Sequence, residues 1–211
     1  MNMELLLKIV KETDAIFFDE RLRADVKKKG DADFVTRADC EISEYLHRRL
    51  SEEFPGVDID AMWGHTRDFL EDYYSRNTVT VKKGLYELLE HLKGAGYKLA
   101  VASSTKKEKV EHHLQSADVR QYFDAVIGGD MVEKSKPEPD IYQTAAAALG
   151  VSPEECYALE DSRNGLLSAY RAGCKVIHVP DLWQPDDTVK SFILGPFEDL
   201  LAVRDWLIAQ A

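Results

Sequence analysis

Three short segments of the chain place polar or charged side chains where phosphate chemistry needs them. Two of these segments directly follow apolar runs, and the third is rich in proline. Hydroxyl groups, a fixed ammonium group and neighbouring carboxylates are the side chains that bind phosphoryl groups and stabilise their transfer. The residues concerned are Ser103 and Ser104 in the first segment, Lys136 in the second, and Glu160 with Asp161 in the third.

Ser103 and Ser104 follow the apolar run 99–102, and helical spacing begins a few residues later. This order predicts a strand, a tight turn and the start of a helix. Free backbone N–H groups at a helix N-terminus bind anions, and ligands of open α/β sheets collect at the carboxyl ends of strands. We therefore predict that Ser103 and Ser104 bind phosphate. An ordinary N-cap is the alternative, because serine is favoured there.

Lys136 stands directly before Pro137, and Pro139 follows two residues later. A proline keeps the preceding residue extended, so this segment should hold the lysine in place before the next helix begins. A fixed ammonium group can neutralise both an attacking carboxylate and a transferring phosphoryl group. We predict a catalytic and phosphate-binding role for Lys136, with a solvated loop lysine as the alternative.

Glu160 and Asp161 end the apolar run 156–159, and a helical pattern follows them. Magnesium prefers hard oxygen ligands and is commonly held by one or two carboxylates together with a substrate phosphate. The pair therefore predicts a Mg²⁺ site. The alternative is helix N-capping by Asp161 or Ser162, since acidic and hydroxyl side chains are favoured at that position.

Taken together in this order, the three segments resemble those of haloacid dehalogenase-like hydrolases, in particular the β-phosphoglucomutase-like branch, over residues 56–211. The resemblance implies an α/β fold with a doubly wound parallel sheet, the Rossmannoid core of that family. It also implies that Ser103 and Lys136 bind phosphate and that Glu160 and Asp161 bind Mg²⁺. The implied activity is that of a phosphatase or phosphomutase acting on a small phosphorylated metabolite of the sugar phosphate class.

The nucleophile motif of that family, Asp-x-Asp-Gly-Thr, does not occur in the chain. The better candidate for the attacking carboxylate is Asp19, which ends the apolar run 15–18. Arg21 stands where the family has its second Asp, and an arginine cannot act as the acid and base. The segment 58–60 has the Asp-x-Asp spacing but reads as a loop and N-cap of a helix at 62–74. A catalytically silent phosphate-binding or scaffold protein is therefore the alternative function.

Residues 3–55 resemble the opening helices of inositol monophosphatases, which suggests a chimera. The resemblance rests on the segments 5–12, 28–39 and 41–54. The positions that match that family's metal-site loop are Lys28, Thr36 and Asp39. The other motifs of that family are missing, so its activity is not expected. This resemblance favours a helix over a strand at 15–19.

The periodicity predicts helices at 3–13, 37–54 and 60–75, within a helical, cap-like region 1–80. Strands at 98–102, 124–127, 156–160 and 175–179 alternate with helices at 84–95, 106–116, 138–149 and 163–172 in a core domain 81–211. A terminal helix at 196–211 should turn Leu200, Leu201, Val203, Leu207 and Ile208 inward. The missing strand belongs between 98–102 and 156–160. Either residues 15–19 supply it, or its two neighbours close together under the first helices.

The composition predicts a globular protein of one or two domains, with 211 residues, 45% hydrophobic and 31% charged. The net charge of -11 argues against nucleic acid as a partner. No signal peptide is visible, and no apolar run approaches the roughly 18 residues that span a bilayer. Cys40, Cys156 and Cys174 read as buried thiols in a reducing cytoplasm. We therefore expect a cytoplasmic protein, and the sequence does not indicate an oligomeric state.

Overall fold

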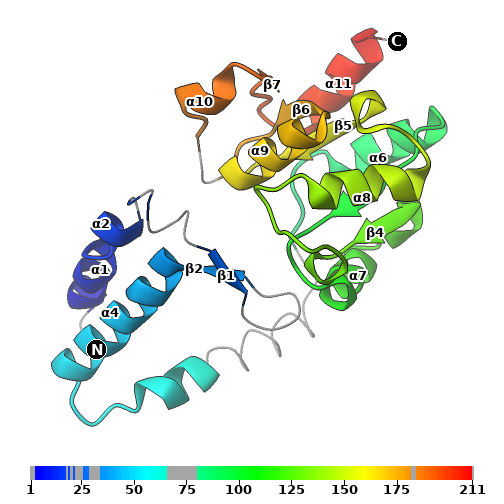
Figure 1. The fold of residues 1–211 in the computed structure, drawn as a ribbon. Coiled ribbons are helices and arrows are strands. Elements are labelled where there is room, and N and C mark those ends of the chain that lie inside the picture. The colour runs from blue at the N-terminus through cyan, green and yellow to red at the C-terminus, as the bar shows by residue number, and fades with distance from the viewer. Residues whose placement is uncertain are drawn as a thin grey trace. The chain divides into compact units, whose positions relative to one another are not determined.

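The computed structural model describes residues 3–17, 19, 21, 26–28, 34–65, 80–181 and 184–210. The chain divides into two compact units, Met1–Asn77 and Thr78–Ala211 (Figure 1). None of the described helices is both long and apolar enough to cross a membrane.

The three cysteines differ in burial. The thiol of Cys174 is buried and that of Cys156 is partly buried, but Cys40 is exposed, so the prediction of three buried thiols is wrong for Cys40.

The described part of the Met1–Asn77 unit consists of helices and a short hairpin. The helices are α1 (Met3–Lys11), α2 (Asp14–Phe17) and α4 (Arg37–Glu53), and residues 59–65 are also helical. The hairpin pairs β1 (Val26–Lys28) with β2 (Phe34–Thr36) in antiparallel register. The core of the Met1–Asn77 unit is formed by the buried side chains of Ile9, Leu50 and Ile59.

Two predictions for this unit need correction. Residues 15–17 lie in α2, so the alternative of a strand at 15–19 is wrong and the helix is confirmed there. The segment between the helices predicted at 3–13 and 37–54 contains the β1–β2 hairpin.

Asp58 caps the helical segment 59–65, because its Oδ1 accepts a hydrogen bond from Ala61 N at 2.9 Å. The rest of the helix predicted at 62–74 lies outside the described residues.

The Thr78–Ala211 unit contains two groups of parallel strands. β3 (Ala100–Ala102) pairs with β4 (Ala125–Ile127), and β5 (Tyr157–Glu160), β6 (Lys175–His178) and β7 (Ile193–Leu194) form the second group in that order. All of these pairings are parallel. In the part of the chain described, no backbone ladder joins β3 to β5. The sheet is therefore divided where the sequence lacks its central strand.

Helices connect and cover these strands, as α/β folds require. They are α6 (Leu85–Gly94), α7 (Lys107–Ser116), α8 (Asp140–Leu149), α9 (Arg163–Ala172), α10 (Asp187–Lys190) and α11 (Leu200–Gln210), with short 3-10 turns η1 (Arg120–Tyr122), η2 (Gly129–Met131) and η3 (Pro153–Glu155). Figure 1 shows α8 and α9 next to the strands of this unit. The alternation of parallel strands and helices confirms the predicted α/β class.

The strands bury apolar side chains against helices in two clusters. The first cluster joins β3 and β4 to β5 and β6 through α8 and α9, and it includes Ile127, Ile141, Ala158, Leu166 and Val176. The second packs α6 and α11 against β5 and β6 and includes Leu88, Ile177, Val203 and Leu207. Burial of each isoleucine, leucine or valine side chain contributes about 1.5–3 kcal/mol. The shared first cluster therefore holds the two strand groups together without a common ladder.

The terminal helix α11 follows the prediction only in part. Leu200, Val203 and Leu207 are buried, as predicted, and Trp206 packs beside Tyr157 with ring centres 5.8 Å apart. Ile208 is 50% exposed, so its predicted inward position is wrong. The helix thus presents a narrower apolar face to the core than the sequence indicates.

Candidate functional site

Lys136 lies where the carboxyl ends of β3 and β5 meet. Its Nζ donates to the backbone oxygen of Ala102 at 3.1 Å and forms an ion pair with Glu160 Oε1. Ala102 ends β3 and Glu160 ends β5. The side chains of Lys136 and Glu160 are only 11% and 8% exposed. Lys136 is therefore held in place, and the alternative of a solvated loop lysine is wrong.

Tyr142, in the first turn of α8, completes the surroundings of this ion pair. Its hydroxyl donates to Glu160 Oε1 at 2.6 Å and lies 3.4 Å from Lys136 Nζ. The Lys136 ammonium also stands 5.0 Å from the centre of the Tyr142 ring, a cation–π distance. Burial and the neighbouring Glu160 carboxylate raise the pKa of Tyr142 well above its usual value. The tyrosine therefore stays neutral and acts as a hydrogen-bond donor.

Glu160 remains charged despite its burial. Burial alone would raise the pKa of this carboxyl, but the Lys136 charge and the hydrogen bonds from Lys136 and Tyr142 outweigh it and lower the pKa. Its second oxygen, Oε2, accepts from Asp161 N at 3.2 Å and from Ser162 Oγ at 3.2 Å. Both oxygens of Glu160 are thus engaged by donors of the protein itself.

The turn after β5 fits closely around this carboxylate. Ser162 is the N-cap of α9, because its Oγ accepts from Gly165 N at 3.1 Å. A Cβ atom at Gly165 would overlap the carboxylate of Glu160. Any larger residue at position 165 would therefore have to displace Glu160. The sequence offered Asp161 and Ser162 as candidates for the N-cap, and the N-cap of α9 is Ser162.

Asp161 points to a different lysine, Lys82, which the sequence analysis did not single out. Lys82 Nζ lies 3.6 Å from Asp161 Oδ2 and 3.2 Å from Asp181 Oδ2. It also donates to the backbone oxygen of Pro180 at 3.4 Å. Lys82, Asp161 and Asp181 are 38%, 40% and 58% exposed, so this second ion-pair group is open to water.

The predicted Mg²⁺ site does not fit the observed arrangement. Both oxygens of Glu160 have protein donors, and Asp161 pairs with Lys82. Among the residues that the structure describes, no group of three or more His, Cys, Asp and Glu side chains is placed to hold a metal ion. Glu160 and Asp161 in these positions are counter-ions of two lysines.

The loop after β3 is held by the loop after β4. Ser103 N donates to Ile127 O at 3.0 Å, and Ser103 Oγ accepts from Thr105 N at 3.2 Å. The N-terminus of α7 is capped by Asp130, whose Oδ1 accepts from Lys107 N at 2.8 Å. A carboxylate therefore already occupies the helix end where the sequence predicted an anion. Ser103 follows Ala102 directly, which brings it to the strand end that Lys136 contacts.

Asp19, the nucleophile candidate, belongs to the Met1–Asn77 unit. It follows α2 and not a buried strand. Asp19 Oδ1 accepts from Arg21 N at 2.9 Å, and Oδ2 lies 3.2 Å from Arg21 NH2. These contacts raise the pKa of the Arg21 guanidinium, first through the hydrogen bond and then through the charge of Asp19. Asp19 is thus not among the residues that the Thr78–Ala211 unit brings together.

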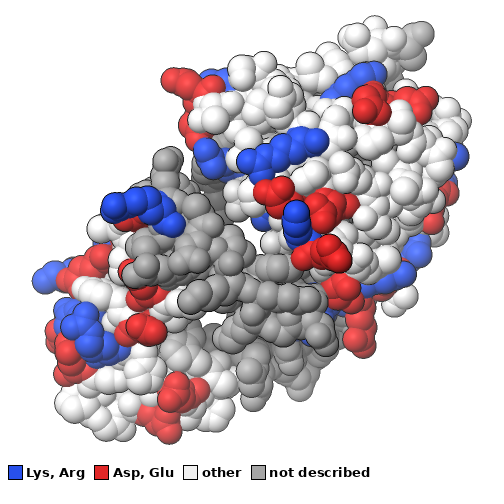
Figure 2. Space-filling view, viewed as in Figure 1, with Lys and Arg blue, Asp and Glu red and all other residues white. Residues whose placement is uncertain are grey.

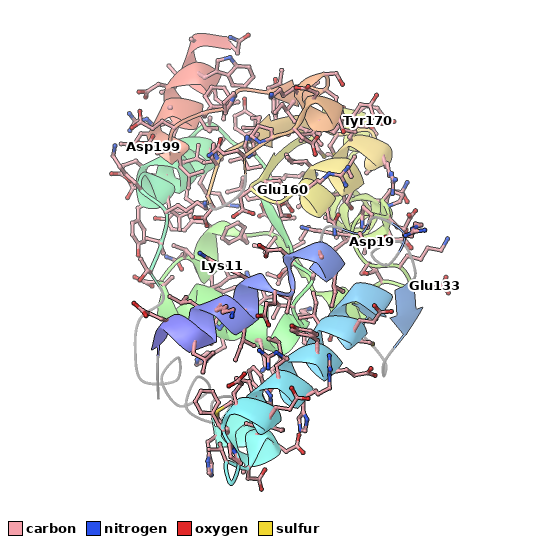
Figure 3. The ribbon with its side chains drawn as sticks, turned by 90° about the vertical axis from the view of Figure 1, so that its left-hand side faces the viewer. Lys11, Asp19, Glu133, Glu160, Tyr170 and Asp199 are labelled. Atoms are coloured by element: carbon pink, nitrogen blue, oxygen red, sulfur yellow. The ribbon has the colours of Figure 1, made fainter. Side chains whose placement is uncertain are left out.

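Figure 2 shows the charged side chains on one face, and Figure 3 labels Glu160 and Asp199. In Figure 2, basic and acidic side chains are interspersed on the visible face of the described residues. In Figure 3, Glu160 lies among the side chains of the Thr78–Ala211 unit, and Asp199 lies apart from it. Asp199 pairs with Lys83, the sequence neighbour of Lys82, at 2.7 Å. The adjacent residues Lys82 and Lys83 therefore pair with carboxylates at two different places in the unit.

Comparison with known proteins identifies relatives of the chain. The family model of haloacid dehalogenase-like hydrolases matches residues 22–179. Protein CbbY of Cereibacter sphaeroides is 34% identical over 145 residues, 67% of this chain and 63% of that protein. A phosphorylated carbohydrates phosphatase of Thermotoga maritima is 33% identical over 148 residues, 64% of this chain and 68% of that protein. The chain thus spans less than two thirds of the length of CbbY.

A solved structure gives the same result at the level of the fold. The structure of CbbY from Rhodobacter sphaeroides in complex with xylulose-(1,5)bisphosphate has a TM-score of 0.51 and 27% identity, and the match covers 85% of this chain and 80% of that one. The family model begins at residue 22, inside the region that resembles inositol monophosphatases, so the predicted chimera is not supported. The chain belongs to the haloacid dehalogenase-like hydrolase family.

Proposed function

We propose that this protein binds the phosphate group of a small phosphorylated carbohydrate beside Ser103, Ser104 and Lys136, and hydrolyses its phosphate ester. The observation that carries the proposal is the buried Lys136 ammonium at the carboxyl end of β3. Two relatives support the substrate class. One is a phosphorylated carbohydrates phosphatase, and CbbY was solved in complex with xylulose-(1,5)bisphosphate.

Lys136 supplies the positive charge in this proposal. Phosphoryl transfer is catalysed mainly by positioning and by charge stabilisation. The ammonium is fixed by Ala102 O, Tyr142 and Glu160, so it needs little reorganisation when negative charge develops nearby. The hydroxyl groups of Ser103 and Ser104 would orient the phosphate oxygens at the adjoining strand end.

Asp19 is the nucleophile candidate from the sequence, and it belongs to the Met1–Asn77 unit. In the proposed hydrolysis, the attacking carboxylate oxygen would form a bond to phosphorus while the ester oxygen leaves with the bonding electrons and takes up a proton. Water would then hydrolyse the aspartyl-phosphate, which releases phosphate and restores the carboxylate. Arg21 pairs with Asp19 and cannot give or take the proton, so water would have to serve as the acid and base.

A second function, phosphate binding without turnover, is favoured by the α-helical conformation of residues 14–17. In this alternative Asp19 is not delivered by a strand, and the protein keeps the binding edge of the fold without an attacking group. A Mg²⁺ requirement, implied by the family resemblance, remains a separate prediction under either function.

The experiment that tests the proposal measures hydrolysis of an aryl phosphate and of a panel of sugar phosphates, with and without Mg²⁺. The native chain is compared with Asp19→Asn, and Asp14→Asn serves as a matched control because Asp14 is an exposed acid in the same unit. We expect turnover in the native chain and in Asp14→Asn, and loss of turnover in Asp19→Asn.

Calorimetric titration with inorganic phosphate separates the two functions. Phosphate binding that weakens in Ser103→Ala, without turnover in any variant, would support the silent binding protein. Turnover that persists unchanged in both Asp19→Asn and Ser103→Ala would contradict the proposed site. Ser103→Ala is preferred to a change at Lys136, because removing Lys136 would also leave the buried Glu160 carboxylate without its cation.

A further inference from the structure

The Lys136 ammonium already engages all three of its N–H donors within the protein. A lysine carries three donors and no acceptor. One donor binds Ala102 O at 3.1 Å, and another binds Glu160 Oε1. The third reaches the Tyr142 hydroxyl at 3.4 Å, which is longer than an ordinary hydrogen bond. A phosphate oxygen that approaches Lys136 therefore has to take over one of these three contacts.

The Glu160 carboxylate competes with any anionic ligand for the same ammonium. Burial of both side chains strengthens the attraction between Lys136 and Glu160. Lys136 can share its charge with a ligand only if other donors stabilise the carboxylate. Glu160 Oε2 has such donors in Asp161 N and Ser162 Oγ, each at 3.2 Å. Among the described residues, the one other donor to Oε1 is the Tyr142 hydroxyl, at 2.6 Å.

We propose that Tyr142 is a positioning residue, whose hydroxyl holds Oε1 of the Glu160 carboxylate so that Lys136 can turn one N–H donor toward a phosphate oxygen. The ligand replaces the long contact from Lys136 to Tyr142, while the bond to Ala102 O keeps the ammonium at the strand end. Tyr142 itself does not touch the ligand. The inference rests on the proposed function, because phosphate is the ligand of that site.

The surroundings of Tyr142 suit this role. The side chain is only 9% exposed, and its ring centre lies 5.0 Å from the Lys136 ammonium. Burial, followed by the charge and the hydrogen bond of Glu160, raises the pKa of the hydroxyl well above its usual value, so the hydroxyl keeps its proton at neutral pH. The Tyr142 N–H donates to Pro139 O at 3.1 Å. The turn that follows Lys136 therefore places the hydroxyl beside the ammonium.

Calorimetric titration with inorganic phosphate tests the role. Tyr142→Phe removes the hydroxyl and keeps the ring, and Tyr170→Phe is the matched control, because Tyr170 is exposed and stacks on Phe192. We expect Tyr142→Phe to bind phosphate about threefold to tenfold more weakly than the native chain, the change that one hydrogen bond implies. The control should bind as the native chain does. Measurable binding with the same affinity in all three proteins would overturn the proposal.

A double variant separates positioning from a general loss of structure. Tyr142→Phe combined with Glu160→Gln removes the charge that competes for Lys136, so this variant should bind phosphate at least as tightly as the native chain. Binding as weak as that of Tyr142→Phe would mean that the hydroxyl is merely structural, and would overturn the proposal. If circular dichroism shows that Tyr142→Phe does not fold, Glu160→Gln alone replaces it. That variant should bind phosphate more tightly than the native chain, and the absence of a gain would overturn the proposal.

NMR spectra of the lysine ammonium groups distinguish failure of this inference from failure of the proposed function. The Lys136 signal is identified by its loss in Lys136→Met. Without the Tyr142 hydroxyl the ammonium should bind Glu160 more strongly, so its proton signal should move to higher frequency in Tyr142→Phe and stay in place in Tyr170→Phe. If this shift occurs and the native chain binds no phosphate, the proposed function alone is contradicted. No shift, or a shift to lower frequency, would overturn the role of Tyr142 whether or not phosphate binds.

Discussion

Glu160 and Asp161 are neighbours in sequence, yet each is paired with a lysine in a very different environment. The Glu160–Lys136 pair is buried, and Tyr142 and Ser162 also bind the carboxylate. The Asp161–Lys82 pair is open to solvent and is shared with Asp181. Breaking a buried pair leaves an uncompensated charge in a medium of low dielectric constant, whereas breaking an exposed pair exchanges it for water.

This difference shows that two ion pairs of the same kind, each between a lysine and a carboxylate, can have different roles at one strand end. The buried pair joins the ends of β3 and β5, which share no ladder in the described part of the chain. The exposed pair contributes little to stability, because water replaces either partner readily. The predictions below test this distinction.

Lys136→Met should have the largest effect. It should lower the free energy of unfolding by about 3–5 kcal/mol, because the Glu160 carboxylate stays buried without its cation. Denaturant unfolding of the native and variant chains measures this loss. The double variant Lys136→Met/Glu160→Leu should recover most of it, since no buried charge is left. A loss under about 1 kcal/mol in the single variant would contradict the structural role of the buried pair.

Tyr142→Phe should have a smaller effect on the same measurement. The variant removes only the hydroxyl that donates to Glu160, and a hydrogen bond to a charged group contributes about 1.5–3 kcal/mol. Tyr170→Phe is the control, because Tyr170 is exposed and stacks on Phe192. We expect the control to stay within about 0.5 kcal/mol of the native chain. Equal losses in both variants would rule out a specific role for the Tyr142 hydroxyl.

Lys82→Met should reduce the free energy of unfolding by no more than about 1 kcal/mol, because its partners are exposed. The same unfolding measurement, made beside Lys136→Met, gives the contrast directly. If Lys82→Met cost as much as Lys136→Met, exposure would not be what separates the two pairs.

The smallest expected effect is a pH dependence from His178, the register partner of Glu160 in β6. Burial, together with the charge of Lys82, lowers the pKa of His178 from its usual 6.5, against the opposite effect of Asp161. The unfolded chain therefore binds this proton more readily, so this contribution to stability is complete well above pH 6.5 and is lost as the pH falls through 6.5 toward the lowered pKa of the folded chain. Between pH of about 8 and 6.5 the loss should be at most about 0.4 kcal/mol.

Unfolding curves at the two pH values measure this change in the native chain and in His178→Gln. The variant has no imidazole to protonate and should lack this part of the pH dependence. An identical slope in both proteins would mean that His178 does not contribute to it.

Much of the Thr78–Ala211 unit could be predicted from periodicity. The strand predicted at 156–160 is β5 (Tyr157–Glu160), and the helix predicted at 163–172 is α9 with the same bounds. Apolar runs and turn residues determine such elements locally. The two-residue strand β7 was not predicted, because so short a segment has no period.

The site could be predicted less completely, because its contacts depend on register and on loops. The ends of β3 and β5 and the proline segment of Lys136 do meet, since the carboxyl ends of parallel strands share an edge. In the sequence, Tyr142 is one aromatic residue of a predicted helix, and only its position shortly after Lys136 indicates that it could contact the site. No sequence pattern indicates that Lys82 belongs to the site, because only the tertiary fold brings it to Asp161.

The divided sheet also affects how amide protons exchange with solvent. The β3–β4 ladder and the β5–β6–β7 ladder have no backbone hydrogen bonds in common in the part of the chain described, so either can open without breaking bonds of the other. Local opening proceeds in contiguous cooperative units, and exchange protection reports the free energy of each. We expect the strand amides to fall into two protection classes, and weakening the Lys136 link should lower the protection of the shorter β3–β4 ladder first.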